Sequence, residues 1–254
     1  MAPANLEEIE ERLGRPRRSA SPSESTYKRY LKATRRGCSS KTTMMFETGG
    51  KLLKEYNDDA HNGSAREFNG VYTNLARNAS FKDGLPAQQL DFFEGVERRE
   101  FRQTRAADDI PRTSLSSNEP DSIIFPHIAG AWKGPGRETE DDQLKQGYNG
   151  AALVYGRRQA LDHMGIPYVE GHSHITTFNT DGTTLNLFAH HSTPYEKWGF
   201  ELPYVYHQYQ ISSTNIRNSY EEFKTAWRQL RNAQDRAREE SLNLRDQFED
   251  YWKS

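Results

Sequence analysis

The chain of 254 residues has little cysteine, few hydrophobic side chains and almost no net charge. Its single cysteine, Cys38, excludes an intramolecular disulfide and any zinc site built from several cysteines. No run approaches the roughly 20 apolar residues of a membrane span, and the first residues lack the apolar stretch of a secretory signal. We therefore expect an intracellular protein, in the nucleus or the cytoplasm, that does not engage a membrane. With 34% hydrophobic and 11% aromatic residues, the composition predicts an average core with long solvated segments.

The formal net charge of -2 hides an uneven distribution of charge. Between Arg12 and Lys41 the chain carries ten basic residues and one acid, Glu24. One interpretation is a solvated, flexible arm, and the other is a segment for phosphate binding or nuclear import, since clustered Lys and Arg attract polyanions. Within this segment Arg35, Arg36 and Lys41 are candidates for contact with nucleic acid.

Hydrophobic patterning predicts an α/β or α+β fold with a central mixed β-sheet flanked by helices. Helices are expected over 27–34, 42–56, 86–104 and 140–164, and strands over 122–125, 128–132, 168–180, 183–191 and 204–211. The pair Asp181-Gly182 between two alternating runs is a strong hairpin signal. The expected organisation is a flexible basic arm (1–24), a helical N-terminal region (25–110), a catalytic core (111–215) and a C-terminal helix (216–254).

The C-terminal segment has a heptad pattern of apolar residues from Ile216 to Tyr251, interrupted by Gln234 and Ser241. Such a helix either packs on its own domain or pairs with a second copy of the chain as a homodimer. The pattern alone leaves both open.

A stretch in the centre of the chain carries the chemistry. Asp121 opens one apolar run and Lys133 closes the next. Two short strands joined by a tight turn would bring them together. A carboxylate binds a hard cation such as Mg²⁺ through oxygen, the cation polarises a phosphate and activates water, and a lysine balances the developing charge.

This stretch resembles the PD-(D/E)XK nuclease superfamily, in which Pro-Asp is followed by acid-X-Lys on the next strand. The wider run over residues 115–250 is similar to a group of fungal proteins that carry such a domain. The resemblance implies a restriction-endonuclease-like core, a Mg²⁺ (or Mn²⁺) cofactor and a nucleic-acid substrate, with DNA expected.

The family acid two residues before the lysine is replaced here by Ala131. Since that acid completes the metal site with Asp121, its loss implies a catalytically impaired chain. Either the domain is a degenerate form that only binds, or it is a deliberately inactivated variant. The otherwise intact flanking motifs favour the second interpretation.

Further site residues are implied by the resemblance alone. A glutamine on the helix after the lysine often faces the site, and Gln143 and Gln146 both match that location. An acid on a preceding helix often adds a metal contact, for which Glu94 and Glu97 are candidates. Arg157 and Arg158 are candidates for phosphate contact, although they also fit an exposed helix face.

A competing hypothesis is a histidine metal site. Six of the eight histidines fall between residues 163 and 207, and His172 and His174 would share one strand face, with His190 or His191 alongside. Their spacing matches no specific zinc motif, so packed or surface histidines are the simpler interpretation.

The sequence thus predicts a metal-dependent nuclease in an impaired form, with a role in genome defence, as a killer toxin or as an effector left open. The alternative is a non-catalytic module that binds nucleic acid or protein. Neither a P-loop motif nor an α/β-hydrolase elbow motif is present.

Overall fold

The computed structural model describes residues 1–35, 41–55, 64–71, 89–101, 122–133, 140–195 and 204–253. These residues form a mixed six-stranded sheet and five α-helices, which makes the protein a member of the α+β class. The elements in chain order are α1 (Leu6–Gly14), α2 (Glu24–Arg35), α3 (Lys41–Leu52), β1 (Ser64–Val71), β2 (Gln89–Glu97), the 3-10 helix η2 (Arg98–Phe101), β3 (Ile123–Trp132), α5 (Glu140–His163), β4 (Ile175–Thr180), β5 (Thr184–Pro194), β6 (Tyr204–Asn215) and α6 (Tyr220–Lys253).

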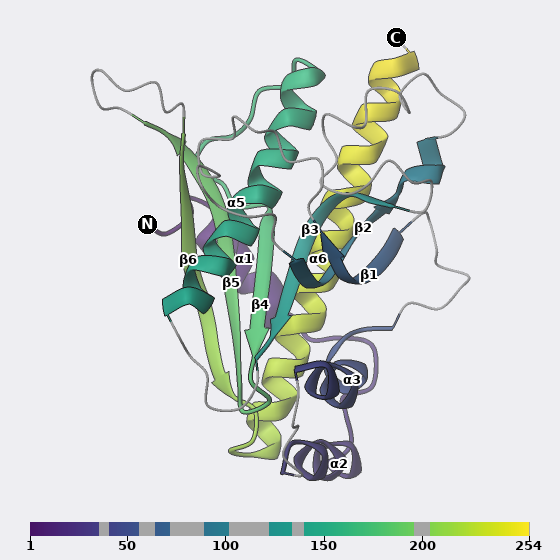
Figure 1. The fold of residues 1–254 in the computed structure, drawn as a ribbon, viewed down its shortest axis with the longest axis vertical. Coiled ribbons are helices and arrows are strands. Elements are labelled where there is room, and N and C mark those ends of the chain that lie inside the picture. Colours follow the sequence, from purple (N-terminus) through teal and green to yellow (C-terminus); the bar gives the residue numbers. More distant parts are fainter. Residues whose placement is uncertain are drawn as a thin grey trace.

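The strands lie in the sheet in their order along the chain, from β1 to β6. All neighbours are antiparallel except β3 and β4, which are parallel. Parallel neighbours need a crossover connection, and α5 provides it. Helix α5 covers one face of the sheet, and α6 covers the other together with α1 and α3 (Figure 1).

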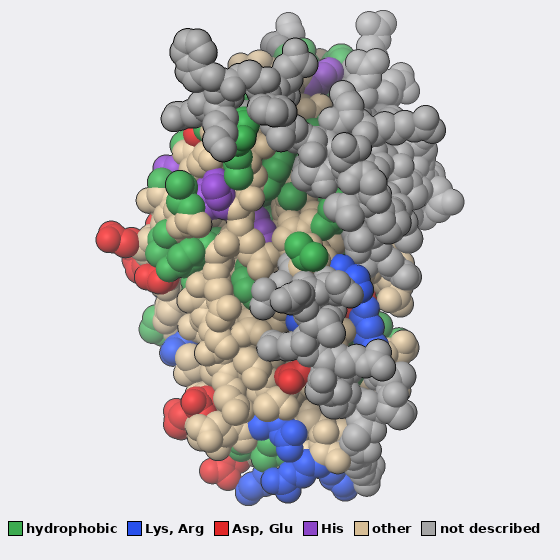
Figure 2. All heavy atoms as spheres, turned by 60° about the vertical axis from the view of Figure 1, so that its left-hand side comes forward, with side chains coloured by type: hydrophobic (Ala, Val, Ile, Leu, Met, Phe, Trp, Pro, Cys, Tyr) green, Lys and Arg blue, Asp and Glu red, His purple; other side chains and the backbone are tan. Residues whose placement is uncertain are grey.

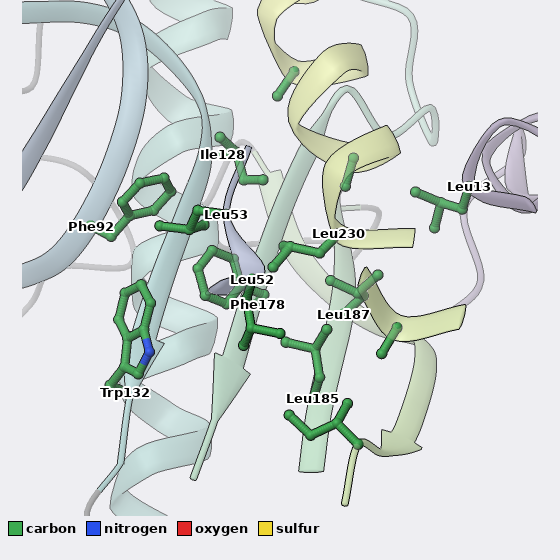
Figure 3. Packing of buried hydrophobic residues seen from close by; sticks show 14 of the residues in the cluster. Leu13, Leu52, Leu53, Phe92, Ile128, Trp132, Phe178, Leu185, Leu187 and Leu230 are labelled. Carbon is green, nitrogen blue, oxygen red and sulfur yellow. The ribbon is translucent and has the colours of Figure 1, made fainter. Parts of the chain in front are cut away.

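The largest core cluster lies between the sheet and α6 (Figure 3). Trp132, Phe178 and Phe92 meet there from β3, β4 and β2, with the Trp132 and Phe178 rings 5.3 Å apart. Leu230 of α6 and Leu52 of α3 close the cluster from the other side. These side chains fill the space between the sheet, α3 and α6.

The predicted hairpin is confirmed. Strands β4 and β5 pair antiparallel around Asp181-Gly182. The Asp181 Oδ1 accepts hydrogen bonds from the backbone N–H groups of Thr183 and Thr184, at 2.7 and 2.8 Å. Gly182 has φ +80°, a left-handed conformation that glycine adopts without steric cost.

Two predicted elements are wrong. The described part of the range 86–104, residues 89–101, forms β2 and η2 and not an α-helix. Both Phe92 and Phe93 are buried, one on each face of the sheet, so β2 lacks the alternation that marks a half-buried strand. The runs 122–125 and 128–132 do not form two strands with a tight turn, because β3 runs through both.

The basic segment is not a free arm in its described part. Helix α1 packs against α6 through the buried side chains of Ile9 and Leu13. Several of its basic residues form ion pairs, among them Arg17 with Asp235 at 2.7 Å. Much of the positive charge is therefore balanced within the chain.

The heptad pattern is explained by packing within one chain. Its residues from Phe223 to Phe248 are buried, and α6 contacts β2, β3, β4 and β6. The polar interruption Gln234 bonds to β2, donating from Nε2 to the Glu94 carboxylate at 2.9 Å. The apolar face of α6 is thus buried against the sheet and is not available for a coiled coil. None of the helices in the described ranges is long and apolar enough to cross a membrane.

Candidate functional site

The end of β3 places Ala131 and Lys133 on the same side of the sheet. Side chains alternate along a strand, so Trp132 points into the α6 core while its two neighbours point to the α5 side. The backbone N–H of Lys133 donates to the Thr180 carbonyl at 2.8 Å, continuing the parallel ladder. Ala131 lies opposite Asn179 in that ladder.

The Lys133 side chain lines a pocket of about 470 Å³ over β4, β5 and β6. The described lining residues include four amides and two hydroxyls, with one aromatic ring and one charge. They are Lys133, Asn179, Thr184, Asn186, Phe188, Gln208, Gln210 and Ser213. No carboxylate is among them. Lys133, 8% exposed, is the charged residue among these described lining residues.

The register of the sheet explains why the amides converge. Asn179 pairs with Asn186 across β4 and β5, and Phe188 pairs with Gln210 across β5 and β6. Directly opposed residues share a face, so alternate positions of the three strands fill one side. The Asn186 Nδ2 donates to the Asn179 Oδ1 at 2.8 Å, which fixes both amides.

The structure describes the side chain of one of the two candidate glutamines on α5. Gln146 is buried, and its Nε2 donates to the Phe178 carbonyl at 2.9 Å, one residue before Asn179. It ties α5 to β4 beside the pocket. The side chain of Gln143 lies outside the described part of the chain.

Asp91 is a buried acid that the sequence analysis missed. It precedes Phe92, which pairs with Gly130, so it lies next to Ala131. Its Oδ2 accepts from the Trp132 backbone N–H at 2.8 Å, and its Oδ1 pairs with the Lys41 Nζ at 2.5 Å. The sequence predicts a helix over 86–104, and an acid in a helical pattern indicates an exposed position. Asp91 was therefore not a candidate for the site.

Asp121 itself lies outside the described residues. Its described neighbour Ser122 precedes β3, whereas Lys133 follows it. Ser122 and Lys133 therefore lie at opposite ends of β3, which is ten residues long. The tight turn that was expected between the runs 122–125 and 128–132 is not present in β3.

Glu94 and Glu97 lie on β2 and not on a helix. Glu94 is buried on the α6 side, paired with the Arg66 guanidinium at 2.5 Å. Burial raises the pKa of Glu94, although the charge and hydrogen bonds of Arg66 act in the opposite direction. Glu97 pairs with Arg99 and lies opposite Ile123, at the end of β3 remote from Lys133. Neither acid shares the pocket with Lys133.

The candidate arginines on α5 are engaged inside the protein. Arg157 donates to the His127 Nε2 at 2.6 Å and lies 3.3 Å from Glu240 of α6. Arg158 pairs with Glu170 at 2.8 Å and stacks on the Tyr204 ring. Their side chains are 10% and 4% exposed, so the expected exposed helix face and the expected phosphate contacts do not fit them.

The remaining basic candidates differ in setting. Arg35 is exposed at the end of α2, and Arg36 lies outside the described residues. Lys41 is half exposed and paired with Asp91, so it approaches the Ala131 corner from α3. Of this group, Lys41 is the one with a described connection to the site.

The histidines do not converge. His190 faces α5 and bonds to the Thr177 hydroxyl at 2.8 Å, while His191 stacks on His207. Burial, with a contribution from His191, lowers the pKa of His190 to about 3. His174 lies 3.0 Å from Glu240. Within the described ranges no three His, Cys, Asp or Glu side chains form a group able to hold a metal ion.

A Mg²⁺ ion does not fit the described residues around Lys133. Asp91 is the nearby carboxylate, and a backbone N–H and the Lys41 ammonium already occupy its two oxygens. Hard cations need several oxygen ligands, which the pocket amides supply only as neutral carbonyls. The arrangement is suited to hydrogen bonding.

No protein-family model matches the chain, and no curated protein is similar to it.

Proposed function

We propose that this chain is a nuclease-type domain, impaired for catalysis, whose site lies at the corner formed by Ala131, Lys133 and Asp91. One observation supports this most: the alanine and the lysine of the acid-X-Lys pattern share a face of β3, and an acid from β2 bonds to the residue between them. In its present form the domain binds nucleic acid, with DNA as the expected partner, and does not cleave it.

The test is to restore the acid. The Ala131→Glu variant is expected to cleave DNA when Mg²⁺ or Mn²⁺ is added, because a second carboxylate would join Asp91 beside Lys133. The metal would supply a polarised phosphate and an activated water. Ala131→Gln has nearly the same shape without the charge, so it is the matched control and is expected to stay inactive.

Lys133 provides a second control in that background. Adding Lys133→Met to Ala131→Glu is expected to lower cleavage by about 10²-fold or more, as for loss of a group that stabilises developing charge. If the Ala131→Glu variant folds and cuts neither DNA nor RNA with either metal, the nuclease proposal is wrong.

An alternative function is a binding module for nucleic acid or protein that never depended on a metal. The absence of a carboxylate among the described pocket residues favours it. The two proposals separate on the same variant, because a binding module would gain no cleavage from an acid at position 131.

A further inference from the structure

We propose that a basic pocket between α2, α3 and α6 binds backbone phosphates of a nucleic acid. The basic pocket has a volume of about 350 Å³, and Arg29 of α2, Lys51 of α3 and Arg231 of α6 line it. None of its described lining residues belongs to the corner formed by Ala131, Lys133 and Asp91. The proposal rests on the proposed function in one respect, namely that the ligand is a nucleic acid.

The basic pocket brings three cations together from three helices, and none of its described lining residues is acidic. Arg29 is exposed and donates a hydrogen bond to the Thr26 hydroxyl at 3.3 Å, with no carboxylate partner among the described residues. Lys51 lies 3.7 Å from the Glu47 carboxylate, which is half exposed, and pairs of this kind contribute little. Clustered cations with so little compensation attract polyanions.

The geometry of Arg231 is suited to a phosphate. Its guanidinium lies 4.0 Å from the centre of the Trp227 ring, which forms one wall of the basic pocket. The Nε and Nη2 groups donate to the backbone carbonyls of Leu52 and Leu53, at 3.2 and 2.7 Å. These bonds fix the plane of the guanidinium and do not use Nη1. A fixed, planar guanidinium is the group that proteins most often use to recognise phosphate.

Arg231 carries a positive charge that its surroundings do not favour. Burial and the neighbouring charge of Arg17 lower the pKa of Arg231 to about 10, although Glu55 and Asp235 act in the opposite direction. The side chain is still charged at neutral pH, and a phosphate in the basic pocket would compensate that charge.

The positive surface continues beyond the basic pocket. Trp227 also lines a second hollow of about 200 Å³, together with Arg17, Lys224, Arg228 and one acid, Glu221. Glu221 pairs with Lys224 at 2.8 Å, whereas the Arg228 Nε is buried without a hydrogen-bond partner in the part of the chain that is described. Figure 2 shows Lys and Arg side chains gathered at the lower end of the molecule, where Figure 1 places α2, α3 and the start of α6. An extended polyanion fits such a surface better than a single small anion does.

Helix α3 connects the basic pocket with the corner of the proposed function. Lys41 at the start of α3 pairs with Asp91 beside Ala131, and Lys51 near its end lines the basic pocket. The ten residues between them span about 15 Å of helix at about 1.5 Å per residue. Each strand of a duplex has a phosphate at about every 3.4 Å along the axis, so a few nucleotides are long enough to reach both places.

The experiment measures binding of fluorescent DNA and RNA of about 20 nucleotides, as single strands and as duplexes, to the full chain in EDTA over a range of salt concentrations. The native chain is expected to bind at least one of them, more weakly as salt rises. Replacing two cations, by Arg29→Gln with Lys51→Gln, is expected to weaken that binding about tenfold or more. The slope of log K against log salt is expected to fall by about 1–2, since each phosphate contact contributes about 0.7–0.9.

The matched control removes two positive charges outside the basic pocket. Lys28→Gln with Lys253→Gln makes the same change in net charge at exposed positions whose lysines pair with Glu24 at 3.3 Å and Asp250 at 3.5 Å. This variant is expected to keep the affinity and the salt slope of the native chain.

The proposed phosphate site is overturned if the Arg29 and Lys51 substitutions leave binding unchanged, if the control weakens it equally, or if no nucleic acid binds. Binding of a phosphoserine peptide in place of every nucleic acid would likewise overturn it. Thermal unfolding checks each variant, and Arg29→Gln alone, at an exposed position, replaces the double variant if the latter does not fold.

The two proposals fail separately. Binding that depends on Arg29 and Lys51, without cleavage by Ala131→Glu, would overturn the nuclease proposal alone. Cleavage by Ala131→Glu, with binding that does not depend on Arg29 and Lys51, would overturn the phosphate site alone.

Discussion

At Gly150, helix α5 packs directly against the His190 ring of β5. A Cβ placed there would overlap the His190 ring, whereas one at Gly147, a turn earlier, would lie 3.6 Å from the Gln208 Oε1. His190 is fully buried and bonded to Thr177, so it has no room to withdraw. We predict that Gly150→Ala lowers the free energy of unfolding by about 1–3 kcal/mol, measured by urea denaturation.

Gly147→Ala is the matched control. The space there accepts a methyl group, and alanine favours helix by up to about 1 kcal/mol over glycine. We expect this variant to be as stable as the native chain or slightly more so. Equal destabilisation by both substitutions would show that α5 does not pack on His190 as described.

Some roles of single residues could be predicted from the sequence and others could not. The Asp181-Gly182 turn was predictable, because its chemistry is local. Asp91 was not predictable as a neighbour of Ala131, since their proximity depends on pairing between strands far apart in the chain.

At the scale of elements, α6 is the clearest test of the packing. Leu230 is fully buried between α6 and the sheet. We predict that Leu230→Ala lowers the free energy of unfolding by about 2–5 kcal/mol, because it removes a large side chain from a closed core. Asn243→Ala, on the exposed side of the same helix, is the control and is expected to change little.

The same helix predicts the behaviour of the chain in solution. Since its seam is buried against its own sheet, light scattering is expected to give the mass of one chain at all protein concentrations tested. A mass that rises toward two chains with concentration would contradict the packing of α6.

Elements were predictable where their period was clear. The long helix α6 and the β4–β5 hairpin follow from apolar spacing and turn residues. Strand β2 was not, because its two buried faces give an apolar spacing that also fits a helix. The heptads of α6 predicted a helix but not its partner, since a sheet and a second helix bury the same seam.

At the scale of the whole molecule, buried titratable groups link stability to pH. Burial and the charge of Arg157 lower the pKa of His127 to about 3. Burial and the charge of His191 lower the pKa of His190 to about 3 as well. Below about pH 6.5 the unfolded chain binds protons at both histidines while the folded chain does not. We predict that stability falls with acidification, by up to about 1.4 kcal/mol per pH unit for each histidine.

Glu240 adds to this loss at lower pH. Burial opposes its ionisation, but the hydrogen bond and charge of His174 and the charge of Arg157 prevail and lower its pKa to about 2. Its contribution is present above about pH 4.5 and is lost as the pH falls toward 2.

Urea titrations between pH 7 and pH 5 measure the slope due to the histidines. His127→Gln and His190→Gln are each expected to make that slope shallower, whereas His172→Gln, at a partly exposed position, is the control and is expected to retain it. A slope that is the same in all of these proteins would show that His127 and His190 are charged in the folded chain.

The α+β class and the mixed sheet between helices could be predicted from the sequence as a whole. The position of the site could be predicted only in part. Ala131 and Lys133 share a face because of strand alternation, which is local. The amides around them come from β4, β5 and β6, and their convergence follows from register, which no local pattern specifies.

We propose that the corner of Ala131, Lys133 and Asp91 is a metal site that lacks one acid. Calorimetric titration with Mn²⁺ tests it without relying on cleavage. The Ala131→Glu variant is expected to bind one ion per chain and the native chain none, and adding Asp91→Asn to the variant is expected to weaken binding at least tenfold. A folded Ala131→Glu variant that binds no Mn²⁺, or binds it equally well without the Asp91 carboxylate, would contradict the claim.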